Sequence, residues 1–322
     1  MKFTPLKFQI PLAAGGVALM AFNYLQFAVP HEKGLIKLSD MPWAGLTTLQ
    51  ISLYLLLIIL MLAFSVINLC CSVTFMKDLC QWLTIKGEYQ DFIKSPPTKS
   101  IGIFVPVASL SMTANVILAP LAFFVPLLSS NLQAMMLPGL IFFGILWSMV
   151  FMLEFKVLKT CLKDPIDATQ LNFIWLLDVF AFGLVSLTGT GIAVLCDNRD
   201  IASIAAFASM FTLSIGFFLF VAKLAYLIYL QLKAGRLPEK SILPAFFLVI
   251  PITCLLGFSF YRITLYLQMY FPLDTKMLSF VILGISYIIT ITWGIFCLYL
   301  LRAYFREDFL KSDFYPTQWG LV

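Results

Sequence analysis

Long runs of apolar residues alternate with short polar segments along the whole chain. Each run is close to or above the roughly 20 residues with which a helix crosses the hydrocarbon core of a bilayer. Backbone groups in lipid must be hydrogen-bonded internally, which leaves only helices and closed barrels, and these runs are too long and too continuous for barrel strands. The pattern predicts an all-α fold, a polytopic membrane helix bundle that forms a single transmembrane domain over residues 1–322. The predicted spans are 8–29, 46–71, 101–127, 134–158, 171–195, 201–230, 242–267 and 276–301.

Prolines recur at similar places in the odd-numbered spans, which lead away from the side of the N-terminus. Pro11, Pro106 and Pro251 each lie near the start or middle of such a span. The third odd-numbered span departs from this pattern, with Trp175 where a proline is expected. Proline removes a backbone donor and clashes with the carbonyl four residues earlier, and the freed carbonyl is tolerated where it faces protein or water. We therefore expect repeated helical hairpins whose kinked outward helices share one central cavity.

The span that contains Pro106 also carries hydroxyl groups through its middle. Pro106, Ser109 and Thr113 fall at i, i+3 and i+7, which places them on one helical face. On a pore-facing surface these groups would solvate a permeating species. Serine and threonine also pack helices together and bond back to the preceding turn, so both interpretations are open for Ser109 and Thr113.

Asp178 is the most informative residue of the third odd-numbered span, because an intramembrane carboxylate is costly and marks a functional site by default. Phe182 and Ser186 follow it on the same helical face. Lys223 lies at a similar depth on the next span. Two arrangements are open: an ion pair between Asp178 and Lys223, or an unpaired Asp178 that lines the pore with Phe182 and Ser186 while Lys223 snorkels. Arg262, a second possible charge partner, lies close to the outer end of its span and is expected to reach the outer interface or vestibule.

The composition agrees with a membrane protein and the charge distribution gives an orientation. Only 11% of the residues are charged, whereas soluble domains have about a quarter. The net charge of +5 raises the question of nucleic-acid binding. However, fifteen of the 21 Lys and Arg residues lie in the segments on one side of the predicted membrane, including the N-terminus, and four lie on the other side. The positive-inside rule then predicts a cytoplasmic N-terminus and explains the basic charge without nucleic acid.

The chain shows no pattern typical of metal or cofactor chemistry. The seven cysteines have no metal-ligand spacing, His31 is the only histidine, and there is no CxxC, HExxH or phosphate loop. A membrane-integral enzyme would need a cluster of His, Cys, Asp or Glu at one depth. We therefore expect no metal, no cofactor and no enzymatic activity.

Several short segments resemble one family in their order and spacing. The first is Phe8-Gln-Ile-Pro-Leu12 followed by Ala-Ala-Gly-Gly16; the others are Glu88-Tyr89, Ser95-Pro-Pro97 before the span with Pro106, Leu237-Pro238 before the span with Pro251, and Phe314-Tyr-Pro-Thr-Gln-Trp-Gly320. In these features the chain resembles the tellurite-resistance/dicarboxylate transporter family, which includes the bacterial TehA proteins and the slow-type anion channels of plant guard cells.

The resemblance implies ten helices in five hairpins, with odd helices around a central pore, even helices outside it, and a homo-trimer. Because eight spans precede Val322, the ninth and tenth helices and the pore-blocking phenylalanine of the family are expected beyond that residue. The family moves small anions or weak acids, such as chloride, nitrate, malate, sulfite or tellurite-like oxyanions. Asp178 departs from the family pattern, since a carboxylate in an anion pore raises the barrier to anions.

The leading hypothesis is a multi-pass channel or transporter for small anions (halide, nitrate, oxyanion or carboxylate) in the plasma membrane, or in the inner membrane of a bacterial cell. Its partners would be the anion, the lipid bilayer and further copies of the chain. The alternative is a proton-coupled secondary transporter for a mono- or dicarboxylate, malate-like, in which Asp178 titrates during the cycle. Saturable uptake that depends steeply on pH, and that loses this dependence in Asp178→Asn, would distinguish the alternative.

Overall fold

The computed structural model describes residues 3–32, 34–163, 171–309, 311, 315, 317 and 318, and within these residues it contains helices and no strands. Eight helical segments are long and apolar enough to cross a membrane, so the predicted all-α bundle with eight spans is confirmed. They are Pro5–Ala28, Thr48–Thr84, Thr98–Phe124, Leu132–Thr160, Phe173–Leu195, Arg199–Ala234, Leu243–Tyr270 and Lys276–Leu300.

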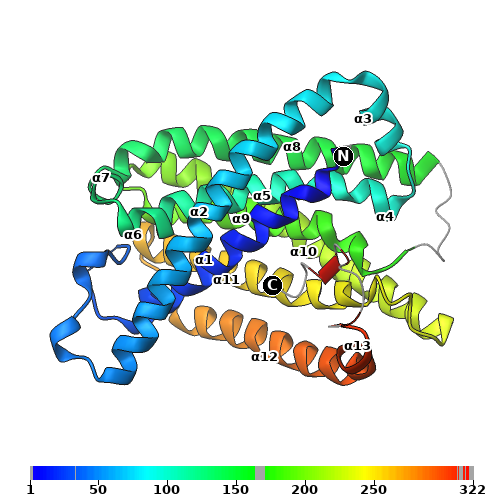
Figure 1. Cartoon of the computed structure of the whole chain (residues 1–322). Helices are drawn as coiled ribbons and strands as arrows, with labels where there is room; N and C mark the ends of the chain where they lie inside the picture. The colour runs from blue at the N-terminus through cyan, green and yellow to red at the C-terminus, as the bar shows by residue number, and fades with distance from the viewer. Residues whose placement is uncertain are drawn as a thin grey trace.

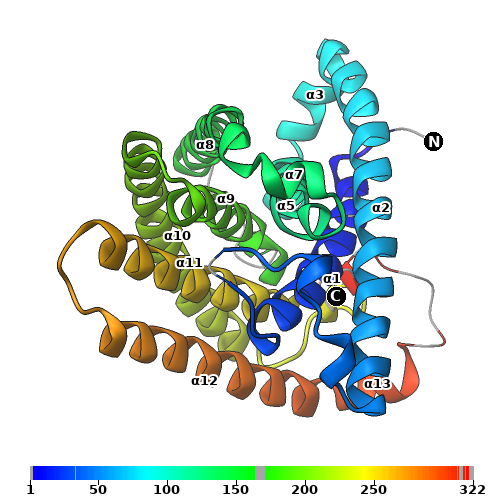
Figure 2. The same cartoon turned by 90° about the vertical axis from the view of Figure 1, so that its left-hand side faces the viewer.

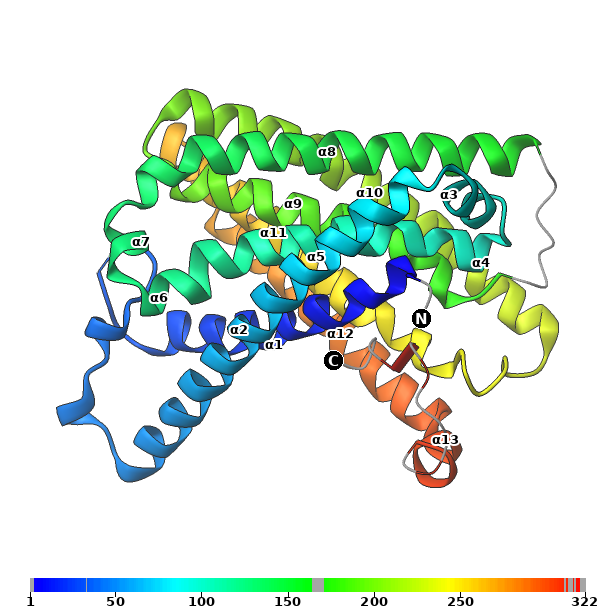
Figure 3. The same ribbon diagram turned by 45° about the horizontal axis from the view of Figure 1, so that its top comes forward.

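The second span is longer than predicted, because its helix continues to Thr84 past the end of the apolar run at residue 71. The extension includes the charged residues Lys77 and Asp78. A prediction from hydropathy stops at the end of the apolar run, although the helix continues. Figure 3 shows this helix crossing the bundle obliquely.

The main helices form four successive hairpins (Figure 1). The outward helices are α1 (Gln9–Ala28), α5 (Phe104–Val116), α9 (Leu177–Leu195) and α11 (Val249–Tyr270). The returning helices are α2 (Thr48–Thr84), α8 (Leu132–Lys163), α10 (Arg199–Ala234) and α12 (Lys276–Leu300). The shorter elements are α3 (Lys86–Ile93), α4 (Pro97–Ser100), a π-helical turn at Ile117–Leu121, α6 (Ala122–Phe124), α7 (Pro126–Ser130) and α13 (Arg302–Glu307).

The outward helices lie inside and the returning helices lie outside. Between 56% and 89% of the apolar segment of each odd span is buried, against 11% to 39% for each even span. Figure 2 shows α2, α8, α10 and α12 around the inner four. Among the inner helices, α1 packs on α5, α5 on α9, and α9 on α11, whereas α1 and α11 share no contact of that extent. The inner helices therefore form an open arc.

All four inner spans are built in the same way, with a 3₁₀ helix that leads directly into the α-helix. In three of them the third residue of the α-helix is proline, namely Pro11, Pro106 and Pro251. The 3₁₀ helices are Pro5–Phe8, Ile101–Ile103, Phe173–Leu176 and Leu243–Leu248. The first four N–H groups of an α-helix have no partner within it, so a proline at this position removes no helical hydrogen bond. These prolines therefore mark the junction between the two helix types instead of breaking the middle of a span.

The exception in α9 is at Val179, not at Trp175 as the sequence suggested. Val179 is the third residue of α9, whereas Trp175 lies one turn earlier in the 3₁₀ helix Phe173–Leu176. The backbone N–H of Val179 donates to Oδ1 of Asp178 at 2.7 Å. The carboxylate thus satisfies a donor that a proline would not have.

The segment after α12 folds back onto the loop that follows α10. Lys240 Nζ lies 2.8 Å from Oδ1 of Asp308, and this hydrogen bond and the charge of Asp308 raise the pKa of Lys240. Tyr304 of α13 is buried and its hydroxyl accepts a hydrogen bond from Gln318 at 3.0 Å. We call the end of the bundle at which the inner helices begin the near end, and the opposite end the far end.

Candidate functional site

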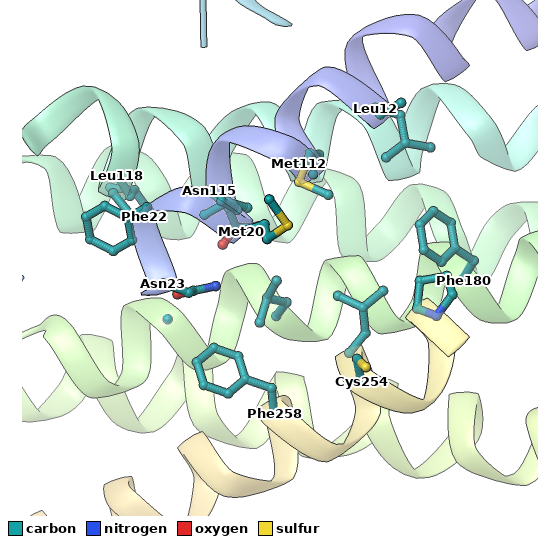
Figure 4. Close-up of a pocket in the computed structure, with 18 of the residues that line it drawn as sticks. Leu12, Met20, Phe22, Asn23, Met112, Asn115, Leu118, Phe180, Cys254 and Phe258 are labelled. Atoms are coloured by element: carbon teal, nitrogen blue, oxygen red, sulfur yellow. The ribbon is translucent and has the colours of Figure 1, made fainter. Parts of the chain in front are cut away.

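A cavity of about 570 Å³ lies between the four inner helices. Its wall runs along α1 from Gln9 to Asn23, a length of about 21 Å at 1.5 Å per residue. Figure 4 shows side chains from α1, α5, α9 and α11 around it, including Asn23, Asn115, Phe180 and Phe258. Most of the lining is leucine, methionine and phenylalanine. All four outward helices thus contribute residues to this cavity.

Three amides interrupt this apolar wall. Asn115 Nδ2 donates to the Ser111 carbonyl and to Thr188 Oγ1, both at 2.8 Å, and so joins α5 to α9. Gln9 Oε1 is buried without a hydrogen-bond partner among the described residues. Asn23 is partly exposed to the cavity near the far end. The amides of Gln9 and Asn23 thus add hydrogen-bonding groups to a mostly apolar wall, whereas both N–H groups of Asn115 are already bonded to α5 and α9.

Arg262 of α11 is the charged residue of the cavity lining. Its Nη1 donates to the Leu187 carbonyl of α9 at 3.0 Å, and its guanidinium lies 4.6 Å from the centre of the Phe258 ring. Among the described residues no carboxylate lies within salt-bridge distance of it. A guanidinium has five N–H donors, so most of its hydrogen-bonding capacity and its whole charge remain available to a solute in the cavity.

Gly191 makes the position of Arg262 possible. A Cβ atom at residue 191 would lie 3.1 Å from Nη1 of Arg262, closer than ordinary van der Waals contact. The glycine thus leaves space for the guanidinium to reach the carbonyl of Leu187, one turn earlier in α9. Thr190 Oγ1 donates to the same carbonyl at 3.2 Å.

A family model described as SLAC1, voltage-dependent anion channel, matches residues 2–322, which is nearly the whole chain. The chain belongs to this family. The resemblance noted from its short motifs is thereby confirmed, and the protein is a multi-pass membrane protein of an anion channel and transporter family. No curated protein and no solved structure matches the chain significantly.

In this SLAC1-family chain, Pro251 and Arg262 are the two sequence-predicted residues that line the cavity. Pro11 instead accepts a hydrogen bond at its carbonyl from Asn68 Nδ2 of α2, at 2.6 Å. Pro106, Ser109 and Thr113 are not among the lining residues, and their face of α5 is turned about a third of a turn away from Met112 and Asn115, which line the cavity.

The hydroxyls of that face serve helix contacts. Thr113 Oγ1 lies 2.8 Å from Ser72 Oγ of α2 and also bonds back to the Ser109 carbonyl at 3.0 Å. Ser109 is fully buried and its hydroxyl has no partner among the described residues. The sequence left two interpretations open for Thr113, and the structure supports the one in which its hydroxyl joins packed helices.

Asp178, Phe182 and Ser186 also share a face, and it too points away from the cavity. The cavity side of α9 is formed by Leu177, Phe180 and residues further along the helix. Phe182 packs edge-on against Phe151 of α8 with ring centres 5.2 Å apart. Ser186 Oγ donates to the Phe182 carbonyl at 2.8 Å.

Asp178 forms an ion pair with Lys223 of α10, so the structure has the paired arrangement. Asp178 is fully buried and Lys223 is 6% exposed. Lys223 Nζ also lies 3.4 Å from the Trp175 carbonyl and 4.3 Å from the centre of the Trp175 ring. Because the lysine is held by these contacts inside the bundle, it does not snorkel to the membrane surface.

Two kinds of site residue were missed by the sequence reasoning. Gln9, Asn23 and Asn115 were missed because a single amide in an apolar helix gives no periodic signal. Glu154, which is 3% exposed, was missed because it lies near the end of its predicted span, where charged residues are ordinary. Within the described residues no group of three or more His, Cys, Asp or Glu is arranged to hold a metal ion.

Proposed function

We propose that this protein moves small anions across the membrane through the cavity between α1, α5, α9 and α11, with Arg262 as the attractive site. The observation that supports this proposal is that Arg262, in the cavity wall of a SLAC1-family chain, has no carboxylate within salt-bridge distance among the described residues. An anion that enters an apolar cavity loses hydration, and a fixed guanidinium offsets part of that cost.

The planar guanidinium suits oxyanions and carboxylates, which accept two parallel N–H bonds, and it also attracts halides by charge alone. Asn23 and Asn115 place amide groups along the same wall. Conduction requires that binding be weak enough for release. The apolar remainder of the lining fits this requirement, because it adds no second charge to hold the ion.

The test is anion flux in proteoliposomes that contain Arg262→Gln, Arg262→Lys or wild type, with chloride, nitrate and malate compared. A hydrogen bond to a charged group contributes about 1.5–3 kcal/mol, so Arg262→Gln should lower flux at sub-saturating anion by roughly tenfold or more. Arg262→Lys keeps the charge and should retain most chloride flux while losing more of the malate flux. The matched control is Arg236→Gln, at an exposed arginine outside the spans. Unchanged flux in folded Arg262→Gln would refute the role of Arg262.

The alternative, a proton-coupled mono- or dicarboxylate transporter with Asp178 in the path, is less well supported by this geometry. Asp178 is paired with Lys223 on the side of α9 that faces away from the cavity. We therefore expect the substrate preference to be the same in Asp178→Asn as in wild type, measured at acidic and neutral pH. A proton-driven uptake of malate that disappears in Asp178→Asn would instead favour the alternative.

We also propose the cellular setting. The excess of Lys and Arg on the side of the N-terminus supports a cytoplasmic N-terminus in the plasma membrane. The exposed apolar faces of the outer helices fit contact with lipid and, by the family resemblance, with two further copies of the chain. We propose no enzymatic activity, no cofactor and no nucleic-acid partner.

A further inference from the structure

Glu154 is a buried carboxylate that the proposed anion path does not use. It lies on α8, is 3% exposed, and neither of its oxygens has a hydrogen-bond partner among the described residues. It interacts electrostatically with both Asp178 and Lys223. Three buried ionisable side chains, from α8, α9 and α10, thus lie within electrostatic range of one another.

The packing of α8 against α9 explains this meeting. Phe151 of α8 contacts Phe182 of α9, and the two helices run in opposite directions. About one turn further along α8 is Glu154, and about one turn back along α9 is Asp178, so the two carboxyl groups come together. Lys223 reaches the same place from α10.

Among the described residues, the charged groups that interact with Glu154 are Asp178 and Lys223. Lys156, two residues on, lies elsewhere, with its Nζ 3.1 Å from the hydroxyl of Tyr89. The inner helix α5, which also packs on α8, has no charged residue. Tyr226 of α10 also lies near the cluster, with its ring 6.4 Å from that of Trp175.

The charges of the cluster do not balance when both carboxyl groups are ionised. Asp178 has Lys223 as its ion-pair partner and also accepts the Val179 N–H. No described residue donates a hydrogen bond to Glu154, and an ionised carboxylate without partners is very costly in a buried site. The balanced state is one in which a single proton occupies the second carboxyl group.

We propose that Glu154, Asp178 and Lys223 form a proton-binding site between α8, α9 and α10, separate from the anion cavity, in which Glu154 carries the proton. Release of the proton leaves two carboxylates competing for one lysine, which weakens the hold of Lys223 on Asp178. The neighbours of Asp178 on the other side of α9, Leu177 and Phe180, line the cavity. Proton occupancy of the site is therefore coupled to the wall of the anion path through a single helix.

The test is the infrared spectrum of the purified full chain in lipid nanodiscs, in which a protonated carboxylic acid has its own C=O stretching band. At neutral pH the wild-type spectrum should contain this band, and Glu154→Gln should lose it. The matched control is Glu307→Gln, at an exposed carboxylate of α13, which should keep the band. Glutamine has nearly the shape of the protonated side chain, so Glu154→Gln should also fold.

A band that stays in Glu154→Gln, or a loss of the ionised-carboxylate signal in that variant, would overturn the assignment. A measurement on wild type alone gives an independent test. The band should disappear on alkaline titration, with a parallel change in the environment of Trp175 seen by fluorescence. A wild-type spectrum without any carboxylic-acid band at neutral pH would refute the proton site whether or not the protein transports anions.

Discussion

Arg262 depends on a glycine in a neighbouring helix for its position. The guanidinium donates to the carbonyl of Leu187 at 3.0 Å, and a Cβ atom at residue 191 would lie 3.1 Å from Nη1 and crowd this contact. The sequence shows a Thr-Gly-Thr-Gly stretch at 188–191, which indicates close approach by another group. It does not show that a charged side chain from α11 is one of the groups that approach.

Gly191→Ala should therefore lower anion flux without removing the charge. The added methyl group displaces Nη1 from Leu187, and the loss of about 1–2 kcal/mol of hydrogen bonding corresponds to roughly a tenfold change in anion affinity. The measurement is the concentration dependence of flux in proteoliposomes. Gly144→Ala is the matched control, because Gly144 is also helical and a Cβ there meets no atom within 4 Å. Equal flux in the two variants would show that Gly191 does not position Arg262.

The polar faces named from the sequence illustrate what periodicity can predict for single residues. Spacing correctly puts Pro106, Ser109 and Thr113 on one face, but it gives no direction for that face. In the third span 78% of the apolar segment is buried, so every side of the helix meets protein and a polar stripe can face a neighbour as well as a pore. The pairing of Asp178 with Lys223 was anticipated as one of two arrangements, because depth in the membrane can be counted along each span.

At the scale of elements, the 3₁₀-to-α junction is the repeated unit of the inner helices. Proline occupies its third α-helical residue in α1, α5 and α11, and Val179 occupies it in α9. The repeat itself was predictable from the spacing of the prolines. That each proline marks a change from 3₁₀ to α-helix was not predictable, because hydropathy does not distinguish a 3₁₀ turn from an α-helical turn.

Val179→Pro should be tolerated. The N–H that proline lacks is bonded to the carboxylate of Asp178 and not to a helical carbonyl, so the cost should be that one hydrogen bond to a charged group, about 1.5–3 kcal/mol. Val185→Pro, in the interior of the same helix, removes a helical hydrogen bond and should cost about 3 kcal/mol or more. The measurement is thermal unfolding in detergent. If both variants unfold at the same temperature, the junction is not a permissive position for proline.

At the scale of the whole molecule, alternation of buried and exposed spans is the main organising feature. The sequence contains this information through the prolines, the resemblance and a small difference in apolarity, since the mean hydropathy is 1.3–2.2 for the inner spans and 2.1–2.6 for the outer spans. The arc of four inner helices encloses the cavity, and the contact between α9 and α11 holds Arg262 in its wall. Such contacts join residues 75 positions apart in the sequence, which single-span patterns do not report.

The orientation of the whole bundle in the membrane can also be predicted and tested. Lys94, between α3 and α4, lies with the near-end segments, and Ser130, at the end of α7, lies at the far end; both are exposed. The near-end segments are those with the excess of Lys and Arg, so they should be cytoplasmic. On a cysteine-free background, a membrane-impermeant maleimide should label Ser130→Cys in intact cells, and Lys94→Cys only after permeabilisation. The reverse labelling would mean that anions approach Arg262 from the cytoplasm, because Arg262 lies toward the far end of α11.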